Sequence, residues 1–476
     1  MQQANDHVAG LRACLTGGAL YVRGDGERSE AEFLEYGRDR TRRAAPDFQI
    51  LIFPTTTEEV AAVVRYCYEH SLAITPSGGR TGLSGGAVAA TGEVVISFDR
   101  MTRLLEFDPY LPALHVEAGM ITAVAQTHAR ERGYQFPLDL AASGSSQVGG
   151  NIATNAGGTR VISIGGLRDY VTGLTVVTGA GEIVRFPGHI LKNNSGIDLR
   201  QLFIGSEGML GLITEAVIRL APAPRREATA LCAVADVAGA LDLLAGLRAA
   251  GLRPLAFEFF DAASLGMVCE HLTLAPPFRE AHAAYVVLGW DEALLSLDAA
   301  VETVFTGSPA ANHIIDLRLA GNSEQAALLW KYRESISESL AMIPPAVHKQ
   351  DVSVPAGRMT RFLRDVHDML AARFADVRLL VFGHLGDGNL HLNYVPGAGG
   401  ASGARPDGDA IDEAVFPLIA AADGSISAEH GIGLLKKKYL HYSRSAAEIQ
   451  VMRGIKALLD PRGILNPGKV LPDSGR

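Results

Sequence analysis

The stretch PSGGRTGLSGGAV, residues 76–88, carries the strongest fold signal in this chain. Five of its thirteen residues are glycine, so successive backbone N–H groups can line a concavity that suits phosphate. It contains no GK[ST] and does not match GxGxxG, which separates it from a Walker loop and from the dinucleotide fingerprint. Strands expected at 73–75 and 94–98 flank the loop, and they favour a binding loop over a flexible linker.

Two further segments are rich in small residues. Residues 137–158, PLDLAASGSSQVGGNIATNAGG, contain Asp139 as their one charged side chain. Residues 203–222 place a run of Gly and Ser before an alternating strand expected at 213–220. Three such loops between β-rich segments predict one extended ligand laid across a mixed α/β domain.

A different chemistry is indicated by FGHLGDGNLHLN, residues 382–393, which carries His384 and His391 among glycines. The later SAEHG adds Glu429 and His430. Imidazole and carboxylate ligands together suit a borderline divalent metal such as zinc, and three protein ligands leave a position open for substrate. The alternatives are that the histidines are turn or core residues and that the Glu-His pair ends a solvated loop.

Composition excludes several classes of function. The 476 residues suggest about three domain-sized units, with 47% hydrophobic and 20% charged residues. A net charge of −9 without a basic run argues against nucleic acid and anionic membranes. No secretory signal is visible, and the most apolar window, 228–247, is interrupted by Asp236 and Asp242, so we expect no membrane span. The cysteines lack any CxxC and predict free buried thiols, a cytoplasmic location and no iron–sulfur relay: Cys14, Cys67, Cys232 and Cys269.

Local patterns predict several elements in the N-terminal half. A short helix is expected around 11–15. Thr55 and Glu58 form a capping-box pattern at the start of a helix that ends near His70. The apolar stripe of this helix is expected to consist of Val60, Val63, Val64 and Cys67.

In the C-terminal half, residues 326–340 predict one helix that carries Arg333 and Ser337 on one face. Lys349 follows in a strand expected from VHKQDVSVP. The other expected features are strands at 285–288 and 313–319, a surface loop at 396–409, a helix at 411–422, and a tail at 458–471 with a helix end, a turn and an extended piece.

The three small-residue segments together resemble the FAD-binding domain of the vanillyl-alcohol oxidase type flavoproteins. In that family the first loop cradles the FAD pyrophosphate, and the second lines the ribityl chain and the flavin. Some members link FAD covalently to a histidine whose position corresponds to Arg80, so the resemblance implies non-covalent FAD. The FAD contacts that it implies are Pro76, Gly78, Gly79, Arg80, Thr81, Gly82, Leu83, Ser84, Gly85, Gly86, Pro137, Asp139, Gly144, Ser145, Gly149, Gly150, Asn151, Thr154, Asn155, Gly157, Gly158, Glu207, Gly208, Gly211, Ile213 and Asn466.

HLGDGNLHLN, SAEHGIG and LDPRGILNPGK, in this order, resemble the D-2-hydroxyacid dehydrogenase branch of the FAD-linked oxidases. The resemblance covers 46–220 and 330–471 and is weakest over 227–325. It implies that His384, His391 and Glu429 bind the metal. It further implies that His430 is the catalytic base, that Asn393 and His430 contact substrate, and that Asn466 lies near the flavin ring.

The implied fold is α+β: a two-part FAD-binding domain of the vanillyl-alcohol oxidase/PCMH type, an α+β substrate (cap) domain with an antiparallel sheet, and a C-terminal helical segment. The expected boundaries are 1–45 for an N-terminal helix and loop, 46–225 for the FAD-binding domain, 226–415 for the substrate domain, and 416–476 for a segment completing the flavin and metal site.

RESIS followed by HKQDVSVP resembles the D-2-hydroxyglutarate enzymes of this branch, in which Arg333, Ser337 and Lys349 would grip a substrate carboxylate. Those enzymes usually have threonine where this chain has Ser337. The implied reaction is FAD- and zinc-dependent oxidation of D-2-hydroxyglutarate to 2-oxoglutarate, with hydride transfer to flavin N5 and D-malate as a second substrate. An Arg fork and a Lys charge suit a second carboxylate, which lactate lacks.

Two rivals remain open, a D-lactate or glycolate dehydrogenase and a non-catalytic flavin-binding subunit of an oxidase complex; Arg333 could also form an ordinary surface ion pair. The expected electron acceptor is external, an electron-transferring flavoprotein or a quinone. The oligomeric state is undecided, and a homodimer stays open.

Overall fold

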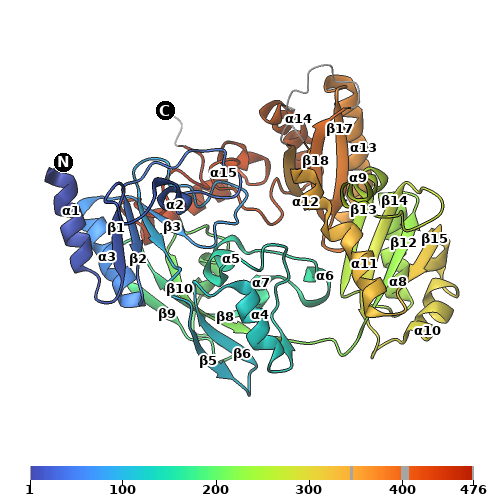
Figure 1. Cartoon of the computed structure of the whole chain (residues 1–476), viewed down its shortest axis with the longest axis horizontal. Coiled ribbons are helices and arrows are strands. Elements are labelled where there is room, and N and C mark those ends of the chain that lie inside the picture. Colours follow the sequence, from blue (N-terminus) through green and yellow to red (C-terminus); the bar gives the residue numbers. More distant parts are fainter. Residues whose placement is uncertain (1, 344–346, 398–406, 474–476) are drawn as a thin grey trace. The chain divides into compact units, whose positions relative to one another are not determined.

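The structure is a computed structural model that describes residues 2–343, 347–397 and 407–473 (Figure 1). Its contacts divide the chain into two compact units. The first unit comprises Met1–Gly157, Gly166–Ala223 and Glu429–Arg476. The second unit comprises Gly158–Gly165 and Pro224–Ala428. The chain therefore leaves the first unit and returns to it at its C-terminal end.

Two sheets form the frame of the first unit. In the four-stranded sheet, of order β1-β2-β4-β3, the pairs β2–β4 and β3–β4 are parallel. The five-stranded sheet, of order β5-β6-β10-β8-β9, is antiparallel throughout. The strands are β1 (Ala19–Val22), β2 (Ile50–Phe53), β3 (Ile74–Ser77), β4 (Val94–Ser97), β5 (Leu104–Asp108), β6 (Ala113–Glu117), β8 (Val171–Val177), β9 (Ile183–Phe186) and β10 (Leu212–Arg219), with β7 (Tyr134–Gln135) and β11 (Ala221–Pro222) as a separate pair. The strands expected on both sides of the first glycine loop are confirmed as β3 and β4.

Helix α3 (Thr57–His70) joins β2 to β3, and its expected stripe of four apolar residues is fully buried. The predicted N-cap is wrong by one residue, because Thr56 and not Thr55 accepts from the backbone N–H of Glu59. The side chain of Glu59 is engaged elsewhere, since it accepts from the backbone N–H groups of Thr16, Gly17 and Thr55. The other helices of this unit are α1 (Gln2–Ala13), α2 (Glu30–Glu35), α4 (Thr122–Arg130), α5 (Val148–Thr154), α7 (Leu167–Tyr170), η1 (Leu199–Leu202), η5 (Lys437–Tyr442) and α15 (Ala446–Leu459).

The C-terminal tail returns to the first glycine loop. After α15 the chain turns, and Leu465 forms a parallel bridge with Ile74 of β3. The backbone N–H of Asn466 donates to Ile74 O at 2.7 Å. The predicted helix end, turn and extended piece at 458–471 are thus confirmed.

The second unit is built on a seven-stranded antiparallel sheet of order β15-β12-β14-β13-β17-β18-β16. Its strands are β12 (Glu227–Val234), β13 (Ala256–Asp261), β14 (Ala284–Asp291), β15 (Asp316–Leu319), β16 (His348–Ser353), β17 (Val377–Gly383) and β18 (Asn389–Pro396). The strand predicted at 313–319 is shorter than expected, because Pro309 begins a 3-10 helix, η3 (Pro309–His313). The α+β class with an antiparallel sheet in the second part is confirmed.

The helix predicted at 326–340 is interrupted. Helix α11 (Ser323–Glu334) ends at Ser335, and α12 (Ile336–Ala341) begins directly after it. The remaining helices of the second unit are α6 (Val161–Ile164), α8 (Val237–Ala249), α9 (Ala262–Leu272), α10 (Leu297–Ala300), η2 (Val301–Phe305), α13 (Ala356–Arg373), η4 (Leu385–Asp387) and α14 (Gly408–Ala421). Helix α14 confirms the helix expected at 411–422, whereas most of the loop expected at 396–409 lies outside the described residues.

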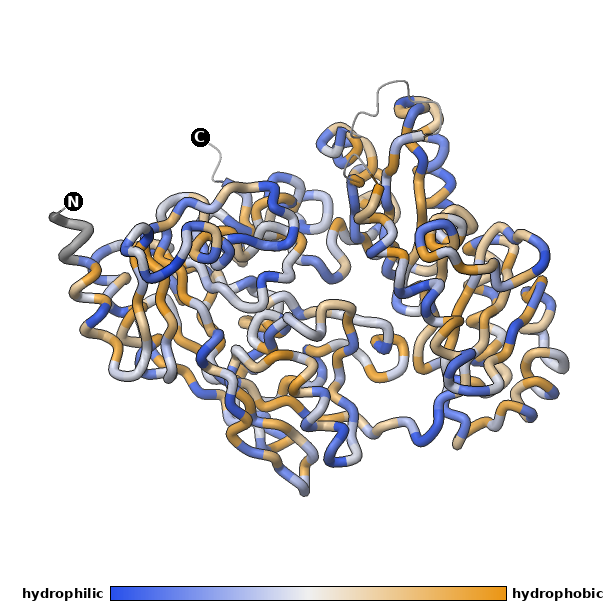
Figure 2. The backbone as a smooth tube through the Cα atoms, in the orientation of Figure 1, coloured by the Kyte–Doolittle hydropathy of each residue, from blue (hydrophilic) through white to orange (hydrophobic). Residues whose placement is uncertain are grey.

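Side chains of α9, α11 and α12 pack on one face of this sheet and form a continuous hydrophobic core with β12, β13, β14, β17 and β18. Figure 2 shows that the strands of both units are the most hydrophobic stretches of the backbone. Within the described ranges, no helix has both the length and the apolar character that crossing a bilayer requires. All four cysteines are free thiols, of which Cys67 and Cys232 are buried.

Candidate active site

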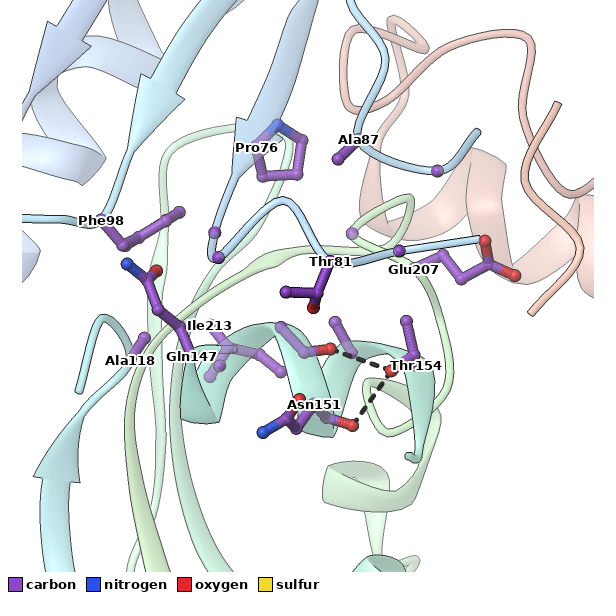
Figure 3. Close-up of a pocket in the computed structure, with 18 of the residues that line it drawn as sticks. Pro76, Thr81, Ala87, Phe98, Ala118, Gln147, Asn151, Thr154, Glu207 and Ile213 are labelled. Atoms are coloured by element: carbon purple, nitrogen blue, oxygen red, sulfur yellow. Dashed lines mark hydrogen bonds between the residues drawn. The ribbon is translucent and has the colours of Figure 1, made fainter. Parts of the chain in front are cut away.

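A pocket in the first unit collects all three small-residue segments predicted from the sequence (Figure 3). The first loop lines one side and α5, from the second segment, lies opposite. The predicted FAD contacts that line it are Pro76, Gly78, Gly79, Arg80, Thr81, Gly82, Ser84, Gly86, Gly149, Gly150, Asn151, Thr154, Glu207, Gly208, Gly211 and Ile213. His430, predicted as the base, also lines this pocket.

The remaining predicted FAD contacts are not among the lining residues: Leu83, Gly85, Pro137, Asp139, Gly144, Ser145, Asn155, Gly157, Gly158 and Asn466. Sequence reasoning missed a second group that does line the pocket: Ala87, Phe98, Ala118, Gln147, Ala153 and Leu212. Most of these are apolar residues that resemble any core residue in sequence. Gln147 could have been found from the sequence. It is a polar amide side chain placed just before Gly149 and Gly150, in a segment otherwise made mainly of small residues.

Close backbone contacts explain the glycines of the first loop. A Cβ on Gly79 would lie 2.1 Å from the carbonyl oxygen of Ser145, so only glycine lets the two segments approach. The loop is also held from outside, because Asp39 accepts from the backbone N–H of Gly85 at 2.6 Å. These contacts fix the path of the loop along the pocket.

Arg80, a predicted FAD contact of the first loop, is tied to its own surroundings. Its φ is +60°, and its guanidinium lies 4.5 Å from the ring centre of Tyr36. It donates to Gly78 O at 2.9 Å and lies 3.5 Å from the Asp99 carboxylate. These contacts hold the side chain in a fixed place beside the pocket.

Gln147 presents a hydrogen-bond acceptor to the pocket. Its Nε2 donates to Asp99 Oδ1 at 2.7 Å, which fixes which end of the amide is the oxygen. Oε1 is buried and has no hydrogen-bond partner within the described part of the chain. A buried acceptor without a partner is costly, so this oxygen is suited to accept from a polar hydrogen of the ligand that fills the pocket.

Glu207 ties the segment of His430 to the pocket wall. Its carboxylate accepts from the backbone N–H groups of Ile432 at 2.6 Å and Gly433 at 2.9 Å. Burial raises the pKa of Glu207, and these two donors oppose that rise. Gly431 lies against the same carboxylate with φ +81°, and a Cβ there would be 2.8 Å from Glu207 Oε1. Glu207 therefore holds the backbone directly after His430.

Asn466, predicted near the flavin ring, hydrogen-bonds to two segments that line the pocket. It is 1% exposed, and its Nδ2 donates to Gly86 O at 2.9 Å and to Glu207 O at 2.7 Å. Lys469 donates to its Oδ1 and to Thr75. Burial lowers the pKa of Lys469 to about 8. The tail thus links the first loop to Glu207, whereas a direct FAD contact by Asn466 stays a prediction.

In the second unit, the two predicted metal-binding histidines lie in the β-hairpin of β17 and β18, His384 directly after β17 and His391 within β18. Gly388, with φ +91°, closes the turn, and Phe382 pairs with His391 across the strands. The ring centroids of His384 and His391 are 5.4 Å apart. The tight glycine turn predicted between them is confirmed, and it brings the imidazoles together.

The same face of the sheet carries other predicted site residues. Lys349 of β16 stands opposite Asn393 of β18, and Asp351 stands opposite His391. Side chains directly opposite each other in an antiparallel pair share a face. Lys349 is exposed, whereas Asn393 is 1% exposed and donates to the carbonyl of His391 at 3.1 Å. Substrate contact by either residue stays a prediction.

The spacing of Arg333 and Ser337 had predicted that both lie on one face of a single helix. In the structure the two side chains have different environments. Ser337 is exposed, whereas Arg333 is 7% exposed and lies 4.6 Å from the ring centre of Phe382. Arg333 Nη2 is 2.7 Å from Oε2 of Glu258, a residue of β13 that the sequence did not single out. Arg333 Nε is buried without a hydrogen-bond partner among the described residues.

The donors in this region fit a borderline divalent metal. His384 Nδ1 lies 2.7 Å from Oε1 of the buried Glu258, which leaves Nε2 as the ring atom with a lone pair. An imidazole held at one nitrogen by a carboxylate is the usual arrangement of a metal-binding histidine. Asp351 accepts from the backbone N–H of Ala428 at 3.2 Å, and Glu429 is the next residue along the chain.

Comparisons with known proteins identify the family to which the chain belongs. Residues 48–187 match the FAD binding domain family. Residues 223–470 match the family described as FAD linked oxidases, C-terminal domain. The chain belongs to the FAD-linked oxidases and is an FAD-dependent oxidoreductase.

Within that family, several relatives match more than nine tenths of this chain. A D-2-hydroxyglutarate dehydrogenase of Xanthomonas citri pv. viticola is 44% identical over 92% of this chain and 93% of its own length. One from Stutzerimonas stutzeri is 39% identical over 91% and 93%. The mitochondrial D-2-hydroxyglutarate dehydrogenase of Bos taurus is 38% identical over 91% of this chain and 79% of its own length.

Solved structures with the same fold are more distant in sequence. A 4-ethylphenol oxidase from Gulosibacter chungangensis has a TM-score of 0.74 at 18% identity and covers 99% of this chain and 98% of its own. An alkyldihydroxyacetonephosphate synthase has a TM-score of 0.67 at 19% identity, over 89% and 76%. At such identities the similarity shows the fold alone.

Proposed function

We propose that this chain oxidises D-2-hydroxyglutarate to 2-oxoglutarate. The observation that carries the proposal is the set of groups on one face of the second unit's sheet: two adjacent imidazoles, a buried arginine and a nearby lysine. Full-length relatives named D-2-hydroxyglutarate dehydrogenase, at 38–44% identity, support the choice of substrate. D-malate, also a dicarboxylic 2-hydroxyacid, is proposed as a second substrate.

Arg333 and Lys349 would select for the second carboxylate of the substrate. The Arg333 side chain has a buried Nε without a partner in the described ranges, and that donor suits a carboxylate oxygen. Lys349 is exposed on β16 and adds a second positive charge. Ser337, also exposed, would add a hydroxyl donor. Lactate has a methyl group in place of the second carboxylate and so offers these side chains no second anionic group.

Removal of the substrate's hydroxyl proton is assigned to His430. A neutral imidazole accepts a proton efficiently near neutral pH. The proposed metal ligands are His384, His391 and Glu429, with zinc as the metal, and Asn393 beside them as a further substrate contact. When bound, non-covalent FAD supplies the acceptor for the hydride from C2, and the cation supplies Lewis-acid character at the substrate oxygen.

Three features support this assignment. His430 lines a pocket to which residues 48–187, the range that matches the FAD binding domain family, contribute most of the lining. His384 is oriented by a buried carboxylate. Glu429 follows Ala428, whose backbone N–H donates to the carboxylate of Asp351, the residue opposite His391. An external electron acceptor, either a flavoprotein or a quinone, and a cytoplasmic location stay predictions.

A substrate screen with an artificial electron acceptor tests the proposal. Purified, flavin-loaded protein is given D-2-hydroxyglutarate, D-malate, D-lactate or glycolate, each with and without EDTA and with zinc restored. We expect D-2-hydroxyglutarate to bleach the flavin absorbance fastest, EDTA to stop the reaction, and zinc to restore it. A clear preference for D-lactate or glycolate would reject the substrate, and absence of bleaching with every acid would favour a flavin-binding subunit.

A further inference from the structure

Glu258 is a fully buried carboxylate in the middle of β13. It lies in the part of the chain, 227–325, for which the sequence suggested no site residue. A carboxylate is rarely found inside a sheet without charged partners, because burial disfavours its ionised form. Its surroundings therefore reveal why an acid occupies this position.

The two oxygens of Glu258 face two different cationic or proton-donating groups. Oε1 is 2.7 Å from His384 Nδ1, and Oε2 is 2.7 Å from Arg333 Nη2. The carboxylate thus bridges an imidazole and a guanidinium.

This contact decides the tautomer of His384. A carboxylate oxygen accepts a hydrogen bond, so His384 must carry its proton on Nδ1 and keep the lone pair on Nε2. That is the form in which an imidazole binds a divalent cation. His391 lacks a contact of this quality with Asp351, whose Oδ1 is 3.6 Å from its Nδ1.

We propose that Glu258 is a positioning residue that presents His384 Nε2 to a divalent cation and, with its other oxygen, sets the place of Arg333. The cation site and the carboxylate-binding arginine would then share one buried anchor. The inference rests on the proposed function, since it takes His384 to be a metal ligand. It goes further by assigning a role to an acid on a different strand from both histidines.

The test measures zinc affinity and not only turnover. Flavin-loaded wild type and Glu258→Gln are stripped with chelator, and the zinc dissociation constant is determined by competition with a coloured chelator. Gln keeps the size of the side chain but removes the charge. We expect zinc to bind about 10–100-fold more weakly to Glu258→Gln, as for other carboxylates that support metal-binding histidines.

Asp412→Asn is the matched control. Asp412 of α14 is also buried, and its Oδ1 lies 2.7 Å from both His348 Nε2 and Gln350 Nε2. His348 and Gln350 alternate with Lys349 on β16, so this acid–histidine pair lies on the opposite face of the sheet. We expect Asp412→Asn to lower the unfolding temperature without changing zinc affinity.

The outcomes separate the two ideas. Wild-type zinc affinity in a folded, flavin-loaded Glu258→Gln protein would overturn the positioning role. If Glu258→Gln does not fold, Glu258→Asp replaces it in the test, because Asp keeps the charge but has a shorter side chain. We expect Glu258→Asp to weaken zinc binding several-fold, and wild-type zinc affinity in that variant would also overturn the positioning role. His384→Ala tests the proposed metal site itself, and unchanged zinc affinity in that variant would reject the ligand assignment on which this inference rests.

Discussion

Replacement of Glu207 by alanine should loosen the segment that carries His430. The carboxylate accepts from the N–H groups of Ile432 and Gly433, and its removal leaves both without this partner. A buried donor left unpaired costs about 1–3 kcal/mol, so the two together cost about 2–6 kcal/mol. Even the lower bound, about 2 kcal/mol, corresponds to a roughly 30-fold increase in opening of this segment.

Hydrogen exchange of the flavin-loaded enzyme measures this opening directly. We expect peptides that cover 429–436 to exchange about 30-fold faster or more in Glu207→Ala, with a parallel fall in kcat because His430 precedes the tether by two residues. Glu207→Gln keeps one acceptor oxygen, so at least one of the two bonds is lost and a smaller effect, about 1 kcal/mol, is expected.

Glu117→Gln provides the control in the same unit. Glu117 is also buried and accepts from the backbone N–H of Arg103 at 2.7 Å, but its contacts lie in the β5–β6 region. Its replacement should speed exchange around Arg103 and leave 429–436 unchanged. Unaltered exchange over 429–436 in a folded, flavin-loaded Glu207→Ala protein would refute the reasoning.

Three further outcomes are expected. Glu59→Gln should lower the free energy of unfolding by about 2 kcal/mol at neutral pH. Burial alone would raise the pKa of Glu59, but N–H donors that include Gly17 and Thr55 bring it to about 2. The stabilisation by this carboxylate is therefore complete above about pH 4.5 and is lost as the pH falls through about 2. The difference in unfolding temperature between variant and wild type should shrink over that range, and a constant difference would contradict the assignment. Gln147→Leu should weaken FAD binding about tenfold, measured by fluorescence during flavin titration, and an unchanged dissociation constant would exclude Oε1 as a cofactor acceptor. Arg333→Ala should reduce kcat/KM for D-2-hydroxyglutarate about 100-fold, but that for any residual D-lactate turnover far less, and equal losses would argue against carboxylate binding by this residue.

Local sequence predicted the parts of the site that depend on short-range backbone geometry. The first glycine loop, its flanking strands and the turn between His384 and His391 all follow from residues within about a dozen positions. Gly79 and Gly388 illustrate the reason, since a close backbone approach or a positive φ restricts the residue type at that position itself. The order of the motifs was enough to indicate the family.

Boundaries were less well determined, because competing hydrogen bonds decide them. Thr56 and not Thr55 caps α3, and the Glu59 side chain accepts from Thr16, Gly17 and Thr55 and does not complete a capping box. The break at Ser335 separates Arg333 from Ser337, although the apolar spacing runs through both helices. The spacing of apolar residues indicates which face of a helix is buried, but it does not indicate which hydrogen-bond partners from other parts of the chain interrupt the helix or set its ends.

Only the tertiary structure decided which groups support the predicted site residues. Glu258 and His384 are 126 positions apart and meet because β13 and β17 are neighbours in the sheet. Glu207 and Ile432 are 225 positions apart and meet because the chain re-enters its first unit. A motif indicates a functional side chain through the local geometry of its own segment. The buried acid that orients this side chain is brought to it by strand pairing, or by the return of the chain to its first unit, and neither leaves a pattern in the local sequence.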